Sequence, residues 1–392
     1  MSRNTADIIE YLKWRGDLPL SVSPMNEVDF MILCNVICVD MTPFFTEKEK
    51  SLTIGEISEK YFSSGADEKA RLGALQPEKV LSMFKMLKDT PRFSNMSVSD
   101  YIYKIDSVAE EQFCAMCVDL GDGTRAVIYQ GTDDTIVGWK ENFNMSFLDS
   151  IPAQRDAAAY LEMIAGKYPE PIKLAGHSKG GNLSIYAAVH SIPEVLSRII
   201  VIYNFDGPGF RREVIDTEHF VAIRDKLRSI VPQGSIIGML MEREENYDVV
   251  RSDASGVYQH DGFSWEIQRD HFVHMETVTE GSKYLDKTIT GWMNSLTIEE
   301  RRDFIKDFFE VLSSTGAKTL SDLARGGFRE FAALAENMNK LDDKKKDMMK
   351  RVMKMFFRSA VPKLTMPKIS MPKLTPLKTK KRDSGGTQNA QD

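Results

Sequence analysis

The segment Gly176-His177-Ser178-Lys179-Gly180, with the residues that flank it, constrains the fold of this chain more than any other stretch. An apolar run at residues 171–175 predicts a buried strand before it, and a helix-periodic run at 181–191 follows at once. Glycines without a Cβ let the strand and the helix approach closely around a backbone that is strained at the serine. The helix N-terminus directs free N–H groups toward any anion that develops there. The pattern therefore predicts a sharp turn that presents the Ser178 hydroxyl.

Strand-like and helix-like segments alternate around this turn. Strands are predicted at 111–119, 125–129, 199–204, 235–241 and 247–251, and helices at 137–147 and 153–168. Such alternation implies right-handed crossovers and a mainly parallel sheet with helices on both faces, which is the α/β class. Reactive groups in such a sheet collect at the carboxyl ends of the strands.

Four regions are expected along the chain. Residues 1–110 read as a helical N-terminal region packed on the core, with Asn26 as an N-cap and Thr53 opening a capping box. The core then extends over 111–296. Residues 297–358 hold helices predicted at 299–314, 318–340 and 342–358, and 359–392 form a tail with proline at every fifth position from Pro362 to Pro372. Recurring proline predicts extended, disordered chain there.

Charge is divided unevenly in this chain, whose formal net charge is −6. Residues 342–382 contain 14 Lys or Arg and 3 Asp or Glu, so a basic segment follows an acidic body. A helix at 342–358 with one Met- and Phe-rich side and one basic side is suited to an anionic membrane surface or an acidic partner. Nucleic acid is not an expected partner, because the acidic body would repel it.

The N-terminal residues lack an apolar signal-peptide core, and no run of 18 apolar residues predicts a membrane-spanning helix. The four cysteines, Cys34, Cys38, Cys114 and Cys117, lie in core-like segments without clustered histidine, so free buried thiols are expected rather than a zinc site. These observations favour a cytoplasmic protein, with peripheral contact at the inner membrane surface as the alternative that the basic segment suggests.

With these residues in hand, the chain resembles the class 3 lipase branch of the α/β-hydrolases, and within it the bacterial Mbeg-like family, a domain of unknown function. The resemblance covers roughly residues 110–270 and rests on four stretches in the same order: Tyr129-Gln130-Gly131-Thr132, Gly176 to Gly181, Tyr203 to Gly209, and Tyr258-Gln259-His260-Asp261 with Trp265 after it. It implies Ser178 as the nucleophile, His260 as the base, and the backbone N–H groups of Lys179 and Thr132 as an oxyanion hole.

Two positions depart from the lipase pattern. Lys179 follows the serine where lipases carry leucine or another apolar residue, and Ser235 stands where the aspartate of the triad is expected. For the acid the sequence favours Asp206, which follows the 199–204 strand and precedes Gly-Pro-Gly; a turn aspartate is the competing interpretation of the same residue. Asp253 and Asp261 are weaker alternatives, and a chain without any acid is the remaining one. His177 is expected to pack into the fold.

We therefore predict a serine hydrolase that cleaves a carboxylic ester or thioester of a small molecule or lipid. Ser178 attacks, His260 transfers protons and Asp206 orients the imidazole. No metal or organic cofactor is implied. The competing hypothesis is a non-catalytic hydrolase fold that serves as an interaction or membrane-surface scaffold, suggested by Ser235, Lys179 and the basic tail.

Overall fold

The computed structural model describes residues 6–69, 79–133, 135–242, 246–283, 296–313 and 316–319. The strands of these ranges are β1 (Ser51–Thr53), β2 (Ser97–Asp106), β3 (Glu111–Asp119), β4 (Arg125–Tyr129), β5 (Ile172–His177), β6 (Ile199–Phe205), β7 (Leu227–Pro232), β8 (Asp248–Val250), β9 (Ile267–Gln268), β10 (His271–Phe272) and β11 (His274–Met275). The α-helices are α1 (Ile8–Arg15), α2 (Glu27–Val36), α3 (Ile54–Ser63), α4 (Lys79–Leu87), α5 (Ile136–Asn144), α6 (Pro152–Lys167), α7 (Lys179–Val189), α8 (Pro193–Arg198), α9 (Arg212–Ile215), α10 (Glu218–Ile223) and α12 (Ile298–Ser313).

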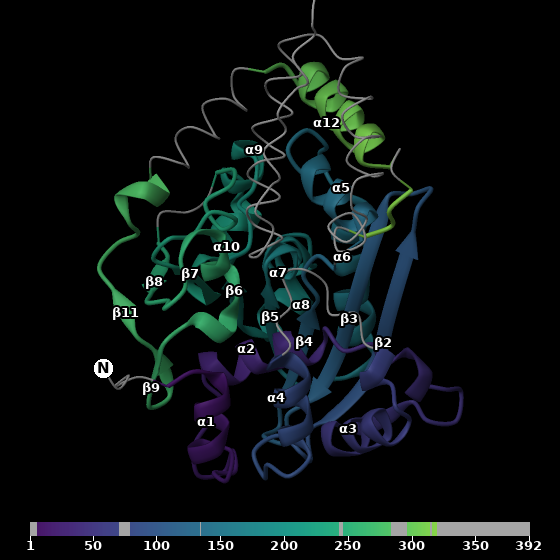
Figure 1. Cartoon of the computed structure of the whole chain (residues 1–392), viewed down its shortest axis with the longest axis vertical. Helices are drawn as coiled ribbons and strands as arrows, with labels where there is room; N and C mark the ends of the chain where they lie inside the picture. Colours follow the sequence, from purple (N-terminus) through teal and green to yellow (C-terminus); the bar gives the residue numbers. More distant parts are fainter. Residues whose placement is uncertain are drawn as a thin grey trace, which may run out of the picture. The chain divides into compact units, whose positions relative to one another are not determined.

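A nine-stranded sheet organises the fold, in the order β1-β2-β3-β4-β5-β6-β7-β8-β11 (Figure 1). Strands β4 to β8 are parallel to one another, whereas β1 to β4 and the pair β8–β11 are antiparallel. The α/β class is confirmed, and the parallel arrangement holds in the centre of the sheet. Because β4, β5 and β6 are parallel neighbours, the segments that follow them meet at one edge.

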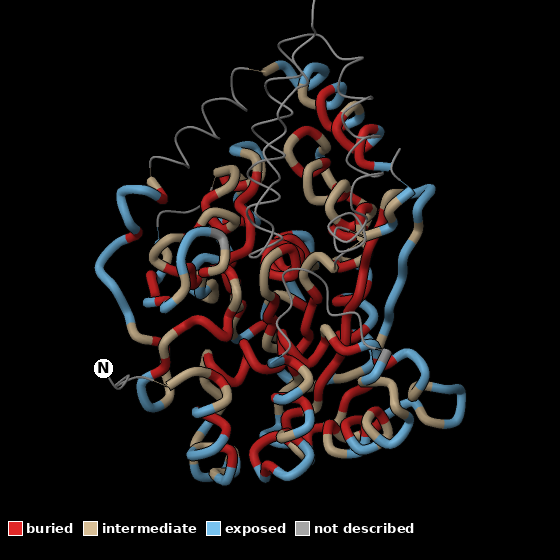
Figure 2. Tube along the Cα trace, viewed as in Figure 1, coloured by how far each residue is buried: buried red, intermediate tan, exposed pale blue. Residues whose placement is uncertain are grey.

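Helices bury both faces of this sheet, and the strand β3 shows how. Its residues Cys114, Met116 and Val118 belong to a core shared with α1 to α4, while Phe113 and Ala115 belong to one shared with α6, α7 and α10. Alternate residues of a strand point to opposite faces, so one strand contributes to two cores. Figure 2 shows the buried stretches concentrated along these central strands and α7.

Two short sequence signals for helix starts are confirmed. The Asn26 side chain accepts from the amides of Val28 and Asp29 at the start of α2, and Thr53 and Glu56 form a capping box at the start of α3. These side chains satisfy N–H groups that have no partner inside the helix.

Other expected elements differ from the structure. The helical entry does not extend to residue 110, because β2 pairs there with β3. The strand expected at 235–241 is wrong: the strand is β7, which ends at Pro232, and a turn follows it. Pairing of β7 with β6 decides this position, and the local apolar pattern of 235–241 does not reveal it. The helices expected at 318–340 and 342–358, and the tail from 359, lie outside the described residues except for Lys318 and Thr319.

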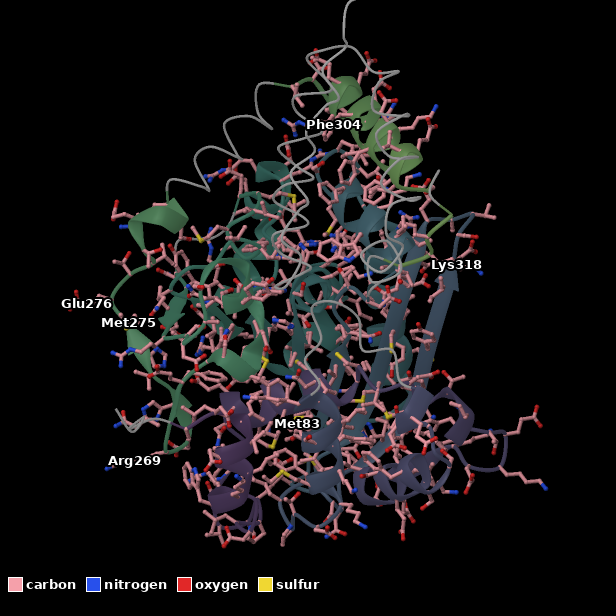
Figure 3. The ribbon with its side chains drawn as sticks, viewed as in Figure 1. Met83, Arg269, Met275, Glu276, Phe304 and Lys318 are labelled. Atoms are coloured by element: carbon pink, nitrogen blue, oxygen red, sulfur yellow. The ribbon has the colours of Figure 1, made fainter. Side chains whose placement is uncertain are left out.

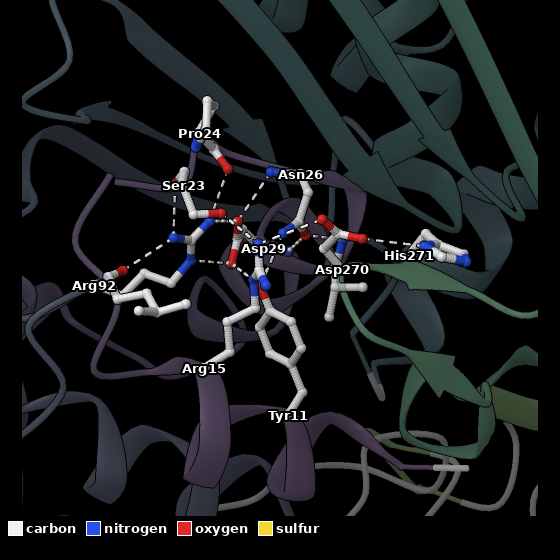
Figure 4. Close-up of polar contacts among 11 residues, drawn as sticks. Tyr11, Arg15, Ser23, Pro24, Asn26, Asp29, Arg92, Asp270 and His271 are labelled. Atoms are coloured by element: carbon white, nitrogen blue, oxygen red, sulfur yellow. Dashed lines mark hydrogen bonds and ion pairs between the residues drawn. The ribbon is translucent and has the colours of Figure 1, made fainter. Parts of the chain in front are cut away.

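A buried ion pair holds the N-terminal helices together (Figure 4). Arg92 donates through Nε and Nη2 to the two carboxylate oxygens of Asp29 at 2.8 and 2.5 Å, and neither side chain is exposed. The same guanidinium donates to the carbonyl oxygens of Leu18, Ser23 and Pro24. The planar fork of arginine matches a carboxylate and leaves N–H groups for these loop carbonyls, so a single side chain fixes the path of residues 18–29.

At the other end of the sheet, α12 packs its apolar side on α5 (Figure 3 labels Phe304 on α12 and Lys318 beyond it). The buried contacts involve Ile136 and Phe147 around α5, and Phe304 and Phe308 on α12. The chain after α12 then returns, and the amide of Ile136 donates to the carbonyl oxygen of Lys318 at 3.0 Å. The helix predicted at 299–314 is therefore confirmed as α12. Within the described ranges, no helix combines the length and apolarity that crossing a bilayer requires.

Candidate active site

Ser178 occupies the turn between β5 and α7 with backbone angles φ 59° and ψ −131°. A positive φ is costly for a residue with a side chain and persists only where the surroundings enforce it. The neighbouring glycines permit the close approach: a Cβ on Gly176 would lie 2.0 Å from the carbonyl carbon of Gly180, and one on Gly180 would lie 2.1 Å from the carbonyl oxygen of Tyr129. The predicted strand-to-helix turn is therefore present, with Ser178 at its apex.

Asp206 lies next to this turn, at the end of the adjacent strand. The amide of Ser178 donates to the carbonyl oxygen of Phe205 at 2.9 Å, and the amide of Asp206 donates in turn to Ile230 of β7 at 2.8 Å. Asp206 also has a positive φ of 49° and is fully buried. A buried carboxylate needs hydrogen-bond partners, and two side chains supply them: Ser235 and His260.

His260 ends the short 3₁₀ segment Gly256–His260 and is 7% exposed. Its Nδ1 lies 2.6 Å from Oδ2 of Asp206. The loop around it is fixed through Gln259, whose carbonyl oxygen accepts from the buried indole of Trp265 at 2.7 Å and whose side-chain oxygen accepts from the amide of Gly234 at 2.8 Å. The tryptophan that follows the histidine thus holds the loop that carries the imidazole.

His177 connects this imidazole to the turn. Its ring centroid lies 4.5 Å from that of His260, and its Nε2 donates to the carbonyl oxygen of His260 at 2.7 Å. Burial, reinforced by the nearby His260, lowers the pKa of His177 to about 3, so the ring is neutral at ordinary pH. The sequence predicts that His177 packs into the fold and does not indicate its contact with His260. No local signal could have identified a partner 83 positions away.

The alternative acids lie elsewhere. Asp261 accepts from the amide of Phe263 at 3.0 Å and so begins the next 3₁₀ turn, and burial raises its pKa to about 6. Asp253 is exposed, and its amide donates to the carbonyl oxygen of Ser264. Of the three carboxylates considered from the sequence, Asp206 is the one whose side chain is hydrogen-bonded to His260.

Ser235, where the lipase pattern has aspartate, is nearly fully buried and donates to Oδ1 of Asp206 at 2.5 Å. A Cβ on Gly238 would lie only 2.1 Å from the same oxygen, so the loop after β7 fits closely around the carboxylate. Ser235 is thus a hydrogen-bond donor to the carboxylate of Asp206, which follows strand β6.

The backbone segments that carry the two predicted amide donors both adjoin Ser178. Lys179 is the first residue of α7, where an N–H group has no partner within its own helix. Thr132 follows Gly131 in the turn after β4, and a Cβ on Gly131 would lie 3.1 Å from Cβ of Ser178. The hydroxyl of Thr132 accepts from the side-chain amide of Asn142. The backbone of this turn therefore runs directly beside the serine.

The side chain of Lys179 is buried, unlike a typical lysine. Its Nζ lies 2.8 Å from Oε2 of Glu141 on α5, and neither side chain is exposed. The same nitrogen donates to the backbone and side-chain oxygens of Gln112, the latter at 2.7 Å. The departure from the lipase pattern at this position is thus an ion pair beneath the turn, which the sequence alone did not indicate.

Among the residues that the structure describes, no group of three or more His, Cys, Asp or Glu side chains is arranged to hold a metal ion. The four cysteines are free thiols, as predicted, with Cys34, Cys114 and Cys117 buried and Cys38 partly so.

Comparisons with known proteins place this site in context. The family model described as Mbeg1-like matches residues 87–310, which include Ser178, Asp206 and His260. Among solved structures, the chain is similar to M37 lipase (14% identity over 54% of this chain and 68% of that one, TM-score 0.35). It is also similar to Lip2 lipase from Yarrowia lipolytica (12% identity over 60% of this chain and 92% of that one, TM-score 0.32). A search of curated proteins found no match.

Proposed function

The chain belongs to the Mbeg1-like family, and from that premise we propose that its site is that of a serine hydrolase acting on a carboxylic ester or thioester. The observation that carries the proposal is the contact between His260 Nδ1 and Asp206 Oδ2, 2.6 Å long and buried beside the strained Ser178 turn. A serine, an imidazole and a carboxylate are the groups that nucleophilic acyl transfer needs. The imidazole and the carboxylate are hydrogen-bonded to each other, and His177 links the loop of His260 to the turn that carries Ser178.

In the first half-reaction, the Nδ1–H group of His260 donates a hydrogen bond to Asp206, which leaves Nε2 of the imidazole unprotonated and able to act as the base. That nitrogen removes the proton of the Ser178 hydroxyl as the oxygen attacks the carbonyl carbon. The amides of Lys179 and Thr132 donate to the oxyanion, and each such donor stabilises the transition state by about 2.7–4 kcal/mol. Collapse breaks the bond to the alcohol or thiol, which leaves with the proton from His260.

The second half-reaction repeats these roles with water. His260 removes a proton from the water that attacks the acyl-enzyme, and returns it to Ser178 as the carboxylic acid departs. Asp206 offsets the positive charge of the imidazolium in both halves, and the hydrogen bond from Ser235 keeps the carboxylate oriented toward Nδ1. The neutral ring of His177 donates a hydrogen bond to the carbonyl oxygen of His260, and this bond holds the loop of His260 next to the Ser178 turn.

A fluorophosphonate probe tests the proposal directly, because it reacts with activated serines. We expect stoichiometric labelling of the folded protein, with the adduct mapped to Ser178 by peptide mass spectrometry, and hydrolysis of p-nitrophenyl butyrate. Ser178→Ala should lose both while keeping its thermal unfolding temperature. Folded wild-type protein that resists the probe and hydrolyses neither the ester nor a butyryl thioester would contradict the proposal.

The scaffold hypothesis predicts a different outcome of the same experiment. One argument for the scaffold is that Ser235 occupies the position where the triad acid is expected. Asp206, which is hydrogen-bonded to His260, can serve as that acid instead. A cellular role that survives Ser178→Ala unchanged would favour the scaffold.

For the basic segment, residues 342–382, we propose contact with an anionic membrane surface, on the basis of its composition. Co-sedimentation with phosphatidylserine liposomes should be stronger for the full chain than for a chain ending at Leu341, and should weaken with added salt. Equal binding by both chains would contradict this role.

A further inference from the structure

We infer that Gln112 is a positioning residue that holds the two oxyanion donors as one unit, through the buried side chain of Lys179. This inference rests on the proposed function. It assigns a role to two residues, Gln112 and Glu141, that lie outside the sequence motifs.

The first step is the placement of Gln112. It belongs to β3, is fully buried, and its side-chain oxygen accepts from Nζ of Lys179 at 2.7 Å. The same oxygen accepts from the amide of Asp133 at 3.4 Å, and the side-chain nitrogen donates to the side-chain oxygen of Gln130 at 3.3 Å. One amide group thus contacts the residue two positions before Thr132 and the residue directly after it.

These contacts join the two donors. Lys179 supplies one amide from the start of α7, and its side chain donates to Gln112. Gln112 in turn contacts residues 130 and 133, which flank Thr132, the source of the second amide. Since an oxyanion hole works only when its donors are held at the position that the developing anion will occupy, a shared anchor has a direct chemical use. The backbone of Gly131 also lies against Ser178, so the turn that carries Thr132 is adjacent to the serine as well.

Glu141 explains why a lysine is needed for this. Its Oε2 contacts Lys179 and accepts from the amide of Gln112 at 3.1 Å, and its Oε1 accepts from the amide of Ala153 at 2.9 Å. A buried ion pair contributes little to net stability compared with apolar residues of similar volume, and can be retained because it specifies one arrangement. Here the arrangement specified is that of β3, α5 and the start of α7 around the turn.

The experiment replaces Gln112 while leaving the charges paired. In Gln112→Met the lysine keeps Glu141 and the backbone oxygen of residue 112, so the variant should fold. With p-nitrophenyl butyrate we expect kcat to fall at least 10-fold, up to about 100-fold, with KM within two-fold, because a displaced donor weakens the transition state and not the ground state. Affinity for butylboronic acid, which forms a tetrahedral adduct, should fall by a similar factor.

Gln154→Met is the matched control. Gln154 is also a buried glutamine with two side-chain hydrogen bonds, one to Asn182 on α7 and one to the amide of Ile151, and neither of these bonds involves residues 130–133. Its kcat should stay within two-fold of wild type. If Gln112→Met fails to fold, Gln130→Leu, which removes the partner of the Gln112 nitrogen, should show the same fall in kcat at constant KM.

The outcomes separate the two proposals. A kcat for Gln112→Met equal to wild type, a change confined to KM, or an equal loss in Gln154→Met would overturn the positioning role while leaving the hydrolase intact. A folded wild-type protein that is neither labelled nor active overturns the proposed function, and the positioning role with it.

Discussion

Two buried ion pairs, Arg92–Asp29 and Lys179–Glu141, have side chains with no exposed surface but different surroundings. Arg92 donates to three carbonyl oxygens of the loop before α2, in addition to its carboxylate, and lies among the N-terminal helices (Figure 4). Lys179 binds one carboxylate and one glutamine directly beneath the Ser178 turn.

The difference follows from the chemistry of the two cations. Arginine presents five donors in a rigid plane and can tie several backbone segments at once, which suits a pair that holds helices together. Lysine is a compact charge on a flexible stem and concentrates its contacts at one point. We therefore expect changes at the arginine pair to alter stability alone, and changes around the lysine pair to alter chemistry as well.

The largest effect should come from Asp206→Asn, which lies beside the Ser178 turn, as the Lys179–Glu141 pair does, and should change the rate of reaction. Loss of the carboxylate removes the group that orients His260 and offsets its charge, so the rate of fluorophosphonate labelling should fall about 10⁴-fold. Asp261→Asn is the control, because that side chain caps a turn; its rate should stay within about two-fold. Equal rates for Asp206→Asn and wild type would remove Asp206 from the site.

Asp29→Asn tests whether the Arg92–Asp29 pair affects stability alone. It leaves the Arg92 guanidinium buried without a compensating charge, which should cost about 3–5 kcal/mol in the free energy of urea unfolding. The labelling rate of the remaining folded molecules should be unchanged. Asp270→Asn, which breaks a half-exposed contact with Arg15, should cost less than about 1 kcal/mol. A loss of labelling rate in folded Asp29→Asn would break the contrast between the pairs.

Lys179→Met should combine both effects. Glu141 loses its cation, so we expect destabilisation of about 3–5 kcal/mol by urea unfolding, together with slower labelling. Adding Glu141→Gln should restore most of the stability, because no charge is then left unpaired, but not the rate. Recovery of the full labelling rate in the double variant would mean that the pair acts on folding alone.

The smallest effect concerns acid stability near the turn. Because the pKa of His177 is about 3 in the folded protein and near 6.5 when unfolded, the unfolded chain binds more protons between these values, and stability falls as pH falls from 6.5 toward 3. His177→Gln should remove this loss, about 1 kcal/mol per pH unit, when unfolding is measured from pH 7 to 4. Asp261, with a raised pKa, acts in the opposite direction between about pH 4 and 6, but it is common to both proteins and cancels in the difference. Parallel pH profiles of wild type and variant would contradict the assignment.

Several features could be predicted from local patterns because their physical cause is local. The Ser178 turn depends on glycines two residues away, and the caps at Asn26 and Thr53 depend on side chains within three residues of the amides they bind. Asp206 was a candidate because it follows a strand at the edge where reactive groups collect. His260 is indicated by the resemblance and by its place after an apolar segment late in the chain, since its immediate neighbours do not distinguish it from a loop histidine.

By itself, then, the sequence determined the strained turn, the class of sheet around it and the candidate residues beside it, because glycine, proline and apolar spacing restrict the backbone wherever they occur. The tertiary structure decided which partners meet: Asp206 with His260 and Ser235, His177 with the loop behind it, and Lys179 with Glu141 and Gln112. Each of these pairs joins residues at least 29 positions apart, and such contacts exist only after strands pair in register and helices cover them.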